Sequence, residues 1–248
     1  MSRAQTRLLV LAVAGAALAL PTVAVAQDIS LSLGDGASLS GRTIQLILLI
    51  TVLSLAPGIA ITITCFPFLV TVLSILRQAL GLQQSPPNML IISLALFLTY
   101  FIMEPVFVDA WQNGISPLLN EDLETETAMR RSLAPFQAFM ANRVDPDTFL
   151  TLAELRPGTA DAILNKDAPP SVLIPSFLLS EISRAFQIGF LVFLPFLIID
   201  LVVAAILMSM GMMMVPPAMV ALPFKLAFFV VSDGWSLIAA ALVRSYGT

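Results

Sequence analysis

The stretch GMMMVPP, residues 211–217, divides the apolar C-terminal third of the chain into two predicted helices. The apolar segment before the double proline covers residues 172–214, and the apolar segment after it covers residues 218–243. Consecutive prolines, Pro216 and Pro217, must end or bend a helix, because proline lacks an amide hydrogen and clashes with the preceding turn. The pattern therefore predicts a helical hairpin with a methionine-rich connection.

Three methionines, Met212, Met213 and Met214, lie in this connection. Methionine is unbranched and polarizable, so it fills irregular gaps and can repack around a changing partner. Two interpretations stay open from the residue types alone. The side chains are either apolar filler at a helix end, or one subunit's share of a soft plug in a pore.

The composition is that of a membrane-associated protein. Of its 248 residues, 58% are hydrophobic and 11% are charged, with a net charge of −4. Soluble globular domains carry about 25% charged residues. No run of lysine and arginine is present, so nucleic-acid binding has no support.

Catalytic and metal-binding signals are missing from the sequence. It contains no histidine, and Cys65 is its single cysteine. Histidine metal sites, Ser-His or Cys-His catalysis and CxxC redox pairs are therefore excluded. We expect no enzyme activity, no cofactor and no metal, although chemistry using only carboxylates or lysine stays formally open.

The N-terminus, residues 1–26, has the pattern of a cleavable signal peptide. Arg3 and Arg7 precede an apolar run over residues 8–20, and residues 24–26 (AVA) form a small-residue cleavage site. The alternative is an uncleaved membrane helix, but the apolar run is shorter than the roughly 20 residues that a span needs. The pattern favours cleavage, with insertion of the mature chain into a bacterial inner membrane.

Residues 44–108 are predicted to form a first apolar hairpin. Their first part is uncharged and longer than one span requires, and Pro57 and Pro67 interrupt it. We expect one span followed by a broken second helix. A further apolar helix over residues 89–103 is expected to end at Pro105.

Residues 109–171 are polar and acidic, with moderate helical periodicity and several prolines. They predict a helical domain outside the bilayer, on the periplasmic side. The fold class is therefore all-α, with membrane-associated helical hairpins flanking a polar helical insert. The expected divisions are a signal peptide (1–26), a polar lead-in (27–43), a first hairpin (44–108), the polar domain (109–171) and a second hairpin (172–248).

Five ionisable residues lie in the last two apolar segments: Glu181, Arg184, Asp200, Lys225 and Asp233. Each costs at least about 2.5–3.5 kcal/mol at a bilayer centre, so each must face protein, water or another subunit. Glu181 and Arg184 are three residues apart and can pair along one helix face. Glu181 could equally reach Lys225, either across a hairpin or in the next subunit. Asp200 has no evident local partner, so it is either a proton carrier or a structural hydrogen-bonding group. Asp233 stands where a local helix break is expected.

Several stretches resemble the FliP/SctR family of type III secretion export gate subunits, over most of the chain from about residue 44. They are residues 76–81 (LRQALG), 84–88 (QSPPN), 185–190 (AFQIGF), 195–200 (PFLIID), 211–217 (GMMMVPP), 222–225 (LPFK) and 233–235 (DGW).

The resemblance implies a core subunit of the flagellar protein export gate. In that family, five copies assemble with FliQ and FliR into a helical, conical oligomer in the basal body, with FlhB and FlhA as neighbours. Unfolded flagellar subunits would pass through its channel within the basal-body ring. The alternative function is an ion- or proton-coupled membrane transporter that uses Asp200, Glu181 and Arg184.

The resemblance also implies roles for individual residues. Residues 212–214 match a methionine gasket around the closed channel. Glu181 and Lys225 match charged positions that pair between subunits, and Arg143 is assigned to the same contact. Residues 65–68 (CFPF) depart from the family, which usually has Thr-Arg after the phenylalanine, so no role is assigned to that turn.

Overall fold

The computed structural model describes residues 39–82, 85–212 and 214–247, and every regular element within them is helical. The predicted all-α class is therefore confirmed. The signal peptide predicted over residues 1–26 lies outside the described residues. The chain divides into two compact units, Met1–Ile50 and Thr51–Thr248, and the charged sites described below lie in the second.

The first apolar region breaks at residues 63–65, between α2 (Leu39–Thr62) and α3 (Phe66–Ala79). Pro57 lies inside α2, so the prediction that it interrupts the helix was wrong. Pro67 lies in the first turn of α3, where the amide hydrogen that proline lacks would have no intrahelical partner. The two prolines therefore differ in position: Pro67 lies at the start of a helix, whereas Pro57 lies inside one.

The next helix, α4 (Asn88–Ala110), continues past Pro105. It passes directly through the π-helical turn η1 (Trp111–Ile115) into α5 (Ser116–Leu119). The predicted end at Pro105 was therefore wrong. A single proline removes one helical hydrogen bond, and packing of the flanking turns can outweigh that loss.

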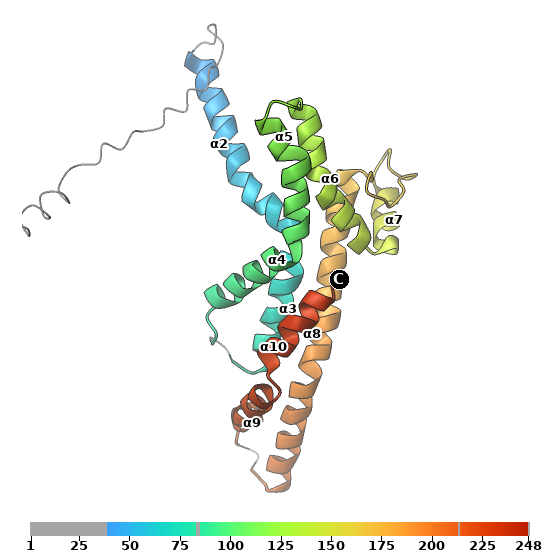
Figure 1. Ribbon diagram of the computed structural model, residues 1–248. Coiled ribbons are helices and arrows are strands. Elements are labelled where there is room, and N and C mark those ends of the chain that lie inside the picture. Colours follow the sequence, from blue (N-terminus) through green and yellow to red (C-terminus); the bar gives the residue numbers. More distant parts are fainter. Residues whose placement is uncertain (1–38, 83–84, 213, 248) are drawn as a thin grey trace, which may run out of the picture. The chain divides into compact units, whose positions relative to one another are not determined.

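The polar insert contains α6 (Thr125–Arg143) and α7 (Pro146–Leu155), and it leads into α8 (Pro170–Ser209). Helix α6 packs against α4 and η1, and α7 packs against α8 (Figure 1). At Gly114 the approach is so close that an added Cβ would lie 2.6 Å from the backbone nitrogen of Ser132. Only glycine allows the π-helical turn to approach α6 this closely.

The insert shares an apolar core with the first half of α8. Phe149 of α7 and Phe177 of α8 are both fully buried there, and Phe139 of α6 packs edge-on against Phe177 with ring centroids 5.8 Å apart. Apolar burial thus ties the insert to α8. The buried members of this core are Met140, Val144, Phe149, Ala153, Ala168, Val172, Leu173 and Phe177.

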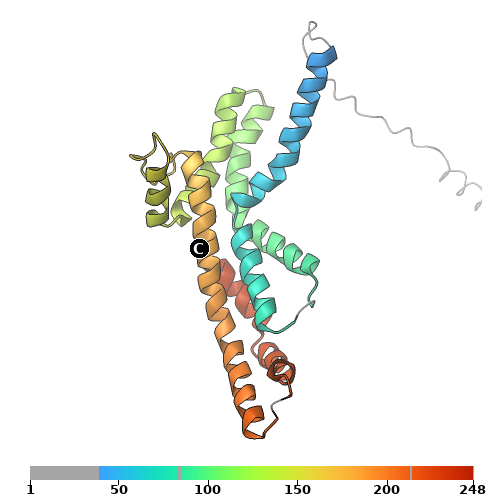
Figure 2. The same ribbon diagram turned by 180° about the vertical axis from the view of Figure 1, so that it is seen from behind.

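Helix α8 spans 40 residues, although it contains Pro175 and Pro195. Helix α3 lies alongside it in both views (Figures 1 and 2). Gly189 lets the two helices approach, since a Cβ there would lie 2.4 Å from Cδ1 of Ile75. A second apolar core, separate from the one that the insert shares with α8, contains the buried face of α3: Phe68, Leu69, Val72, Leu73, Leu76 and Ala79.

The C-terminal segment forms two helices, α9 (Pro217–Val231) and α10 (Gly234–Arg244). They are bent by 63° at the break between them. Asp233 adopts a left-handed conformation with φ of 48° immediately before α10. The local helix break predicted at this residue is confirmed.

Three helical segments among the described residues are long and apolar enough to cross a membrane: Thr43–Thr62, Asn88–Leu119 and Pro170–Ser209. The bent pair α9 and α10 is a fourth candidate if it forms one span. Large apolar side chains remain exposed along these helices. Such surfaces require lipid or other protein as their environment.

Candidate functional site

The first charged site surrounds Glu181, whose side chain is fully buried on α8. Arg143, the last residue of α6, donates from Nε to Glu181 Oε1 at 3.2 Å. Its Nη2 lies 3.1 Å from the same oxygen, as an ion pair without hydrogen-bond geometry. Arg184 Nη1 lies 3.4 Å from Oε1, so the predicted pairing along the α8 face is confirmed.

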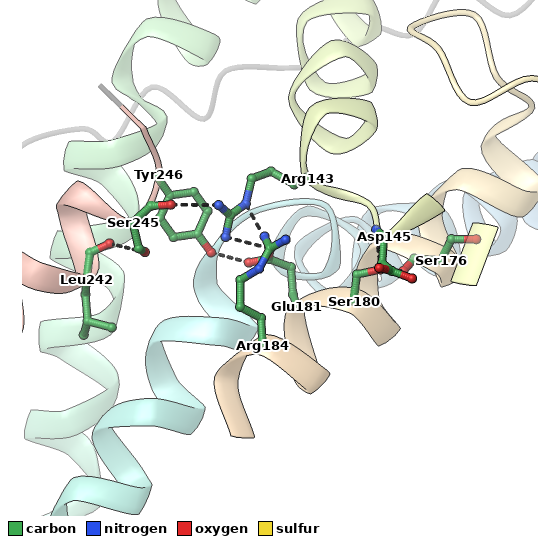
Figure 3. Close-up of polar contacts among 9 residues, drawn as sticks. All are labelled: Arg143, Asp145, Ser176, Ser180, Glu181, Arg184, Leu242, Ser245 and Tyr246. Atoms are coloured by element: carbon green, nitrogen blue, oxygen red, sulfur yellow. Dashed lines mark hydrogen bonds and ion pairs between the residues drawn. The ribbon is translucent and has the colours of Figure 1, made fainter. Parts of the chain in front are cut away.

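The C-terminal turn completes this site (Figure 3). The Tyr246 hydroxyl donates to Glu181 Oε2, and Arg143 Nη1 donates to the Ser245 carbonyl at 2.8 Å. The Arg143 guanidinium also lies 4.0 Å from the centre of the Tyr246 ring. Burial raises the pKa of the Tyr246 phenol above its ordinary value, and the Glu181 charge adds to this effect.

The chain turns sharply beside Glu181 for a local reason. Asp145 is the N-cap of α7, and its carboxylate accepts from the Thr148 amide at 2.9 Å. That hydrogen bond lowers the pKa of the Asp145 carboxyl. The Asp145 amide donates to Ser180 Oγ on α8 at 3.0 Å. These contacts hold the end of α6 beside α8 and so place Arg143 on Glu181.

The second charged site joins three helices through Lys225 of α9. Its Nζ lies 2.6 Å from Asp200 Oδ2 on α8 and donates to the Ala79 carbonyl at the end of α3, at 3.0 Å. The Lys225 side chain is almost fully buried, whereas that of Asp200 is 30% exposed. Asp200 therefore has a partner that the sequence analysis did not recognise.

Hairpin register offered a signal for this pair. Asp200 lies 12 residues before Met212 (212 − 200), and Lys225 lies 12 residues after Met213 (225 − 213). In an antiparallel hairpin centred on those methionines, the two positions face each other. Tyr246 and Ser245 offered no such signal, because they lie 65 and 102 residues from their partners.

No ion pair joins Glu181 to Lys225 within the described residues of one chain. Each is paired with other residues of its own chain. Pairing of Glu181 with Lys225 between subunits stays a prediction.

The methionine connection starts with a defined helix end. Gly211 has φ of 75°, its amide donates to the Met208 carbonyl, and the Met212 amide donates to the Leu207 carbonyl. This 6→1 and 5→2 pattern is a Schellman motif, for which glycine is favoured. Met214 is 97% exposed and Met212 is 41% exposed. Met213 lies outside the described residues.

Metal binding has no candidate site in the described part of the chain, because no three His, Cys, Asp or Glu side chains gather there. Cys65 is a buried free thiol whose pKa is raised to about 12 by burial. Both charged sites instead pair carboxylates with cations, which holds helices together.

Long apolar helices joined by buried ion pairs define a helical membrane protein. Comparison with known families makes this specific, since a model of the FliP family matches residues 49–242. The chain belongs to the FliP family.

Relatives that carry the name "Flagellar biosynthetic protein FliP" match most of the chain, as three examples show. The Caulobacter vibrioides protein is 50% identical over 232 residues, covering 92% of this chain and 85% of the relative. The Agrobacterium fabrum protein is 46% identical, covering 92% and 95%, and the Bacillus subtilis protein is 45% identical, covering 82% and 92%. Flagellar biosynthesis is therefore the process to which this family belongs.

Proposed function

We propose that the chain is a core subunit of the flagellar type III protein export gate, where it forms part of the channel for unfolded flagellar subunits. Membership of the FliP family supports a place in flagellum assembly. The observation that carries the channel role is the exposed methionine connection between α8 and α9.

The geometry of this connection suits a gasket. The Schellman motif at Gly211 and the prolines at its other end restrict the backbone. Met214 projects almost completely free of its own chain. A ring of such side chains would seal by apolar contact and could repack around a passing peptide without polar requirements.

The proposed assembly contains five copies of the chain with FliQ and FliR, next to FlhB and FlhA, in the inner membrane and flagellar basal body. The polar insert would lie on the periplasmic side, within the basal-body ring. Exposed apolar side chains on α4, α8 and α9 support extensive contacts with other subunits or lipid.

The alternative, an ion- or proton-coupled transporter, is less well supported by the contacts. A proton carrier needs a carboxylate that exchanges its proton readily, whereas Asp200 is held by Lys225, and Glu181 by Arg143 and Arg184. Asp200→Asn separates the two functions. It should abolish transport without harming assembly if Asp200 is a carrier, and should weaken the hairpin if Asp200 is structural.

Deletion of the gene tests the proposed function. We expect no flagella by microscopy and no hook or filament subunits in the medium, with both restored by the intact gene. Complete but paralysed flagella would overturn the export role and favour ion conduction. Intact, rotating flagella would exclude a role in flagellum assembly.

Replacement of Met212, Met213 and Met214 by alanine tests the gasket. We expect increased membrane conductance to small ions while export of flagellar subunits survives, because alanine leaves the closed channel unfilled. Met129→Ala is the matched control, since Met129 is also exposed but lies in the polar insert on α6. Unchanged conductance in the triple variant would contradict the gasket.

A further inference from the structure

The two oxygens of the Glu181 carboxylate have different partners. Among the described residues, the arginine contacts all go to Oε1: Arg143 through Nε and Nη2, and Arg184 through Nη1. Among the described residues, the partner of Oε2 is the Tyr246 hydroxyl. The orientation of the carboxylate plane therefore depends on the tyrosine as well as on the arginines.

The Tyr246 ring is itself held on several sides. It stacks on Phe139 of α6, with centroids 6.0 Å apart and planes at 12°, and forms a T-shaped pair with Phe68 of α3, with centroids 5.4 Å apart. The Arg143 guanidinium covers the ring at 4.0 Å. A ring fixed in this way delivers its hydroxyl to one point.

The backbone beside Tyr246 is tied to the same arginine, because the Ser245 carbonyl accepts from Arg143 Nη1. We propose that Tyr246 is a positioning residue for Glu181, and that residues 244–247 form a clasp that closes over the buried carboxylate. We call these residues the C-terminal clasp. It connects the end of α10 to α6 and α8 through a single buried charge (Figure 3), and to α3 through the Phe68 ring.

The clasp has a consequence for assembly that rests on the proposed function. Oε2 is the oxygen without an arginine, so a cation from a second copy would compete with Tyr246 for it. Tyr246 would then set how readily Glu181 enters a contact between subunits. The clasp itself is tested on the purified full chain in detergent, so its failure is distinguishable from failure of the export function.

Cys65 is a built-in reporter of the clasp. It is the single cysteine of the chain, is fully buried, and lies within electrostatic reach of Tyr246 and Glu181. We expect slow maleimide labelling of the unaltered chain. Tyr246→Phe removes a hydrogen bond to a charged group, so local opening and labelling should become about ten- to a hundredfold faster.

Tyr100→Phe is the matched control, because Tyr100 is the other tyrosine of the chain and is 62% exposed. Its labelling rate should equal that of the unaltered chain. Removal of residues 245–248 should speed labelling at least as much as Tyr246→Phe. Unchanged labelling in both the Tyr246→Phe and the truncated chain would overturn the clasp.

A second measurement does not depend on altering Tyr246. Tyr100→Phe leaves Tyr246 as the only tyrosine, so phenolate absorbance reports its ionisation alone. Glu181, Arg143 and Cys65 are the charged or titratable groups that face it. We expect no phenolate at about pH 10–11, where a free tyrosine ionises, and ionisation at lower pH after Glu181→Gln. Ionisation near pH 10 without that change would refute the positioning role.

Discussion

Glu181 and Asp200 are carboxylates in apolar helical surroundings, and the chain stabilises them differently. Glu181 is completely removed from solvent and is surrounded by two arginines and a tyrosine hydroxyl. Asp200 remains partly exposed and relies on Lys225, with its Oδ1 buried and without a hydrogen-bond partner among the described residues. Loss of Lys225 would leave both oxygens of the Asp200 carboxylate without a partner in the described part of the chain, so the Asp200 pair should depend more strongly on its single cation than the Glu181 site does on either arginine.

A double-mutant cycle on this second pair measures its coupling. Lys225→Met removes the ion pair with Asp200 and the hydrogen bond to the Ala79 carbonyl, and should lower the free energy of unfolding by about 1–3 kcal/mol. Asp200→Asn should cost less, because that side chain is partly exposed. The double variant should lose less than the sum of the single changes. Denaturant unfolding in detergent, followed by circular dichroism, provides the measurement, and strictly additive losses would show that the pair is uncoupled.

Sequence reasoning found the charged residues of both sites but paired them incompletely. The Glu181–Arg184 spacing is a local helical signal and was sufficient. The Asp200–Lys225 pair was accessible through hairpin register, which was not applied. Tyr246 could not be found, because neither composition nor periodicity indicates that a C-terminal turn lies on α6.

At the scale of helices, a single proline rarely ends an element in this chain. Helices α2, α4, α6, α8 and α9 each contain an internal proline. Several real breaks instead carry a residue in the left-handed region: Gly81, Gly211 and Asp233. A residue at positive φ leaves the right-handed helical conformation and so ends the helix, whereas a single proline removes one hydrogen bond and crowds the preceding turn, which packing can offset. The breaks predicted at the single prolines Pro57 and Pro105 were wrong for this reason.

Glycine at a helix crossing is predicted to be irreplaceable, in contrast to glycine in an open helix. Gly114→Ala would place a methyl group against the Ser132 backbone, and should lower the free energy of unfolding by about 1–3 kcal/mol. Gly58→Ala is the matched control, because among the described residues nothing beyond its chain neighbours and its own helix backbone lies within 4 Å of its Cβ position in α2. The control should be neutral or stabilising by about 0.5–1 kcal/mol. Thermal unfolding of both variants provides the measurement. Equal changes in the free energy of unfolding would show that the η1–α6 contact is not tight.

At the scale of the whole chain, the helical class and the second hairpin follow from hydropathy and the Pro216–Pro217 break. The sharing of a core between the polar insert and α8 does not follow. Phe139, Phe149 and Phe177 are separated in sequence, and their contact depends on the turn at Asp145. That turn also brings Arg143 to Glu181. Neither the shared core nor the complete Glu181 site could therefore be predicted from the sequence, because both depend on the same long-range packing.

The completed Glu181 site changes the expected result of exchanging the two charges proposed to pair between subunits. A contact made only between copies would be restored by combining Glu181→Lys with Lys225→Glu. In this chain, however, a lysine at position 181 would face Arg143 and Arg184, and a glutamate at position 225 would face Asp200. Like charges at these distances, partly out of water, repel strongly.

We therefore expect each single change to prevent assembly and the double exchange to do no better. Purification of the complex through a tagged copy, with circular dichroism of the single chain, separates loss of assembly from loss of folding. Recovery of the complex by the double exchange would show that contact between subunits outweighs the pairs within the chain. Failure with an intact helical signal would show that Glu181 and Lys225 must first satisfy their own chain before they can serve a neighbour.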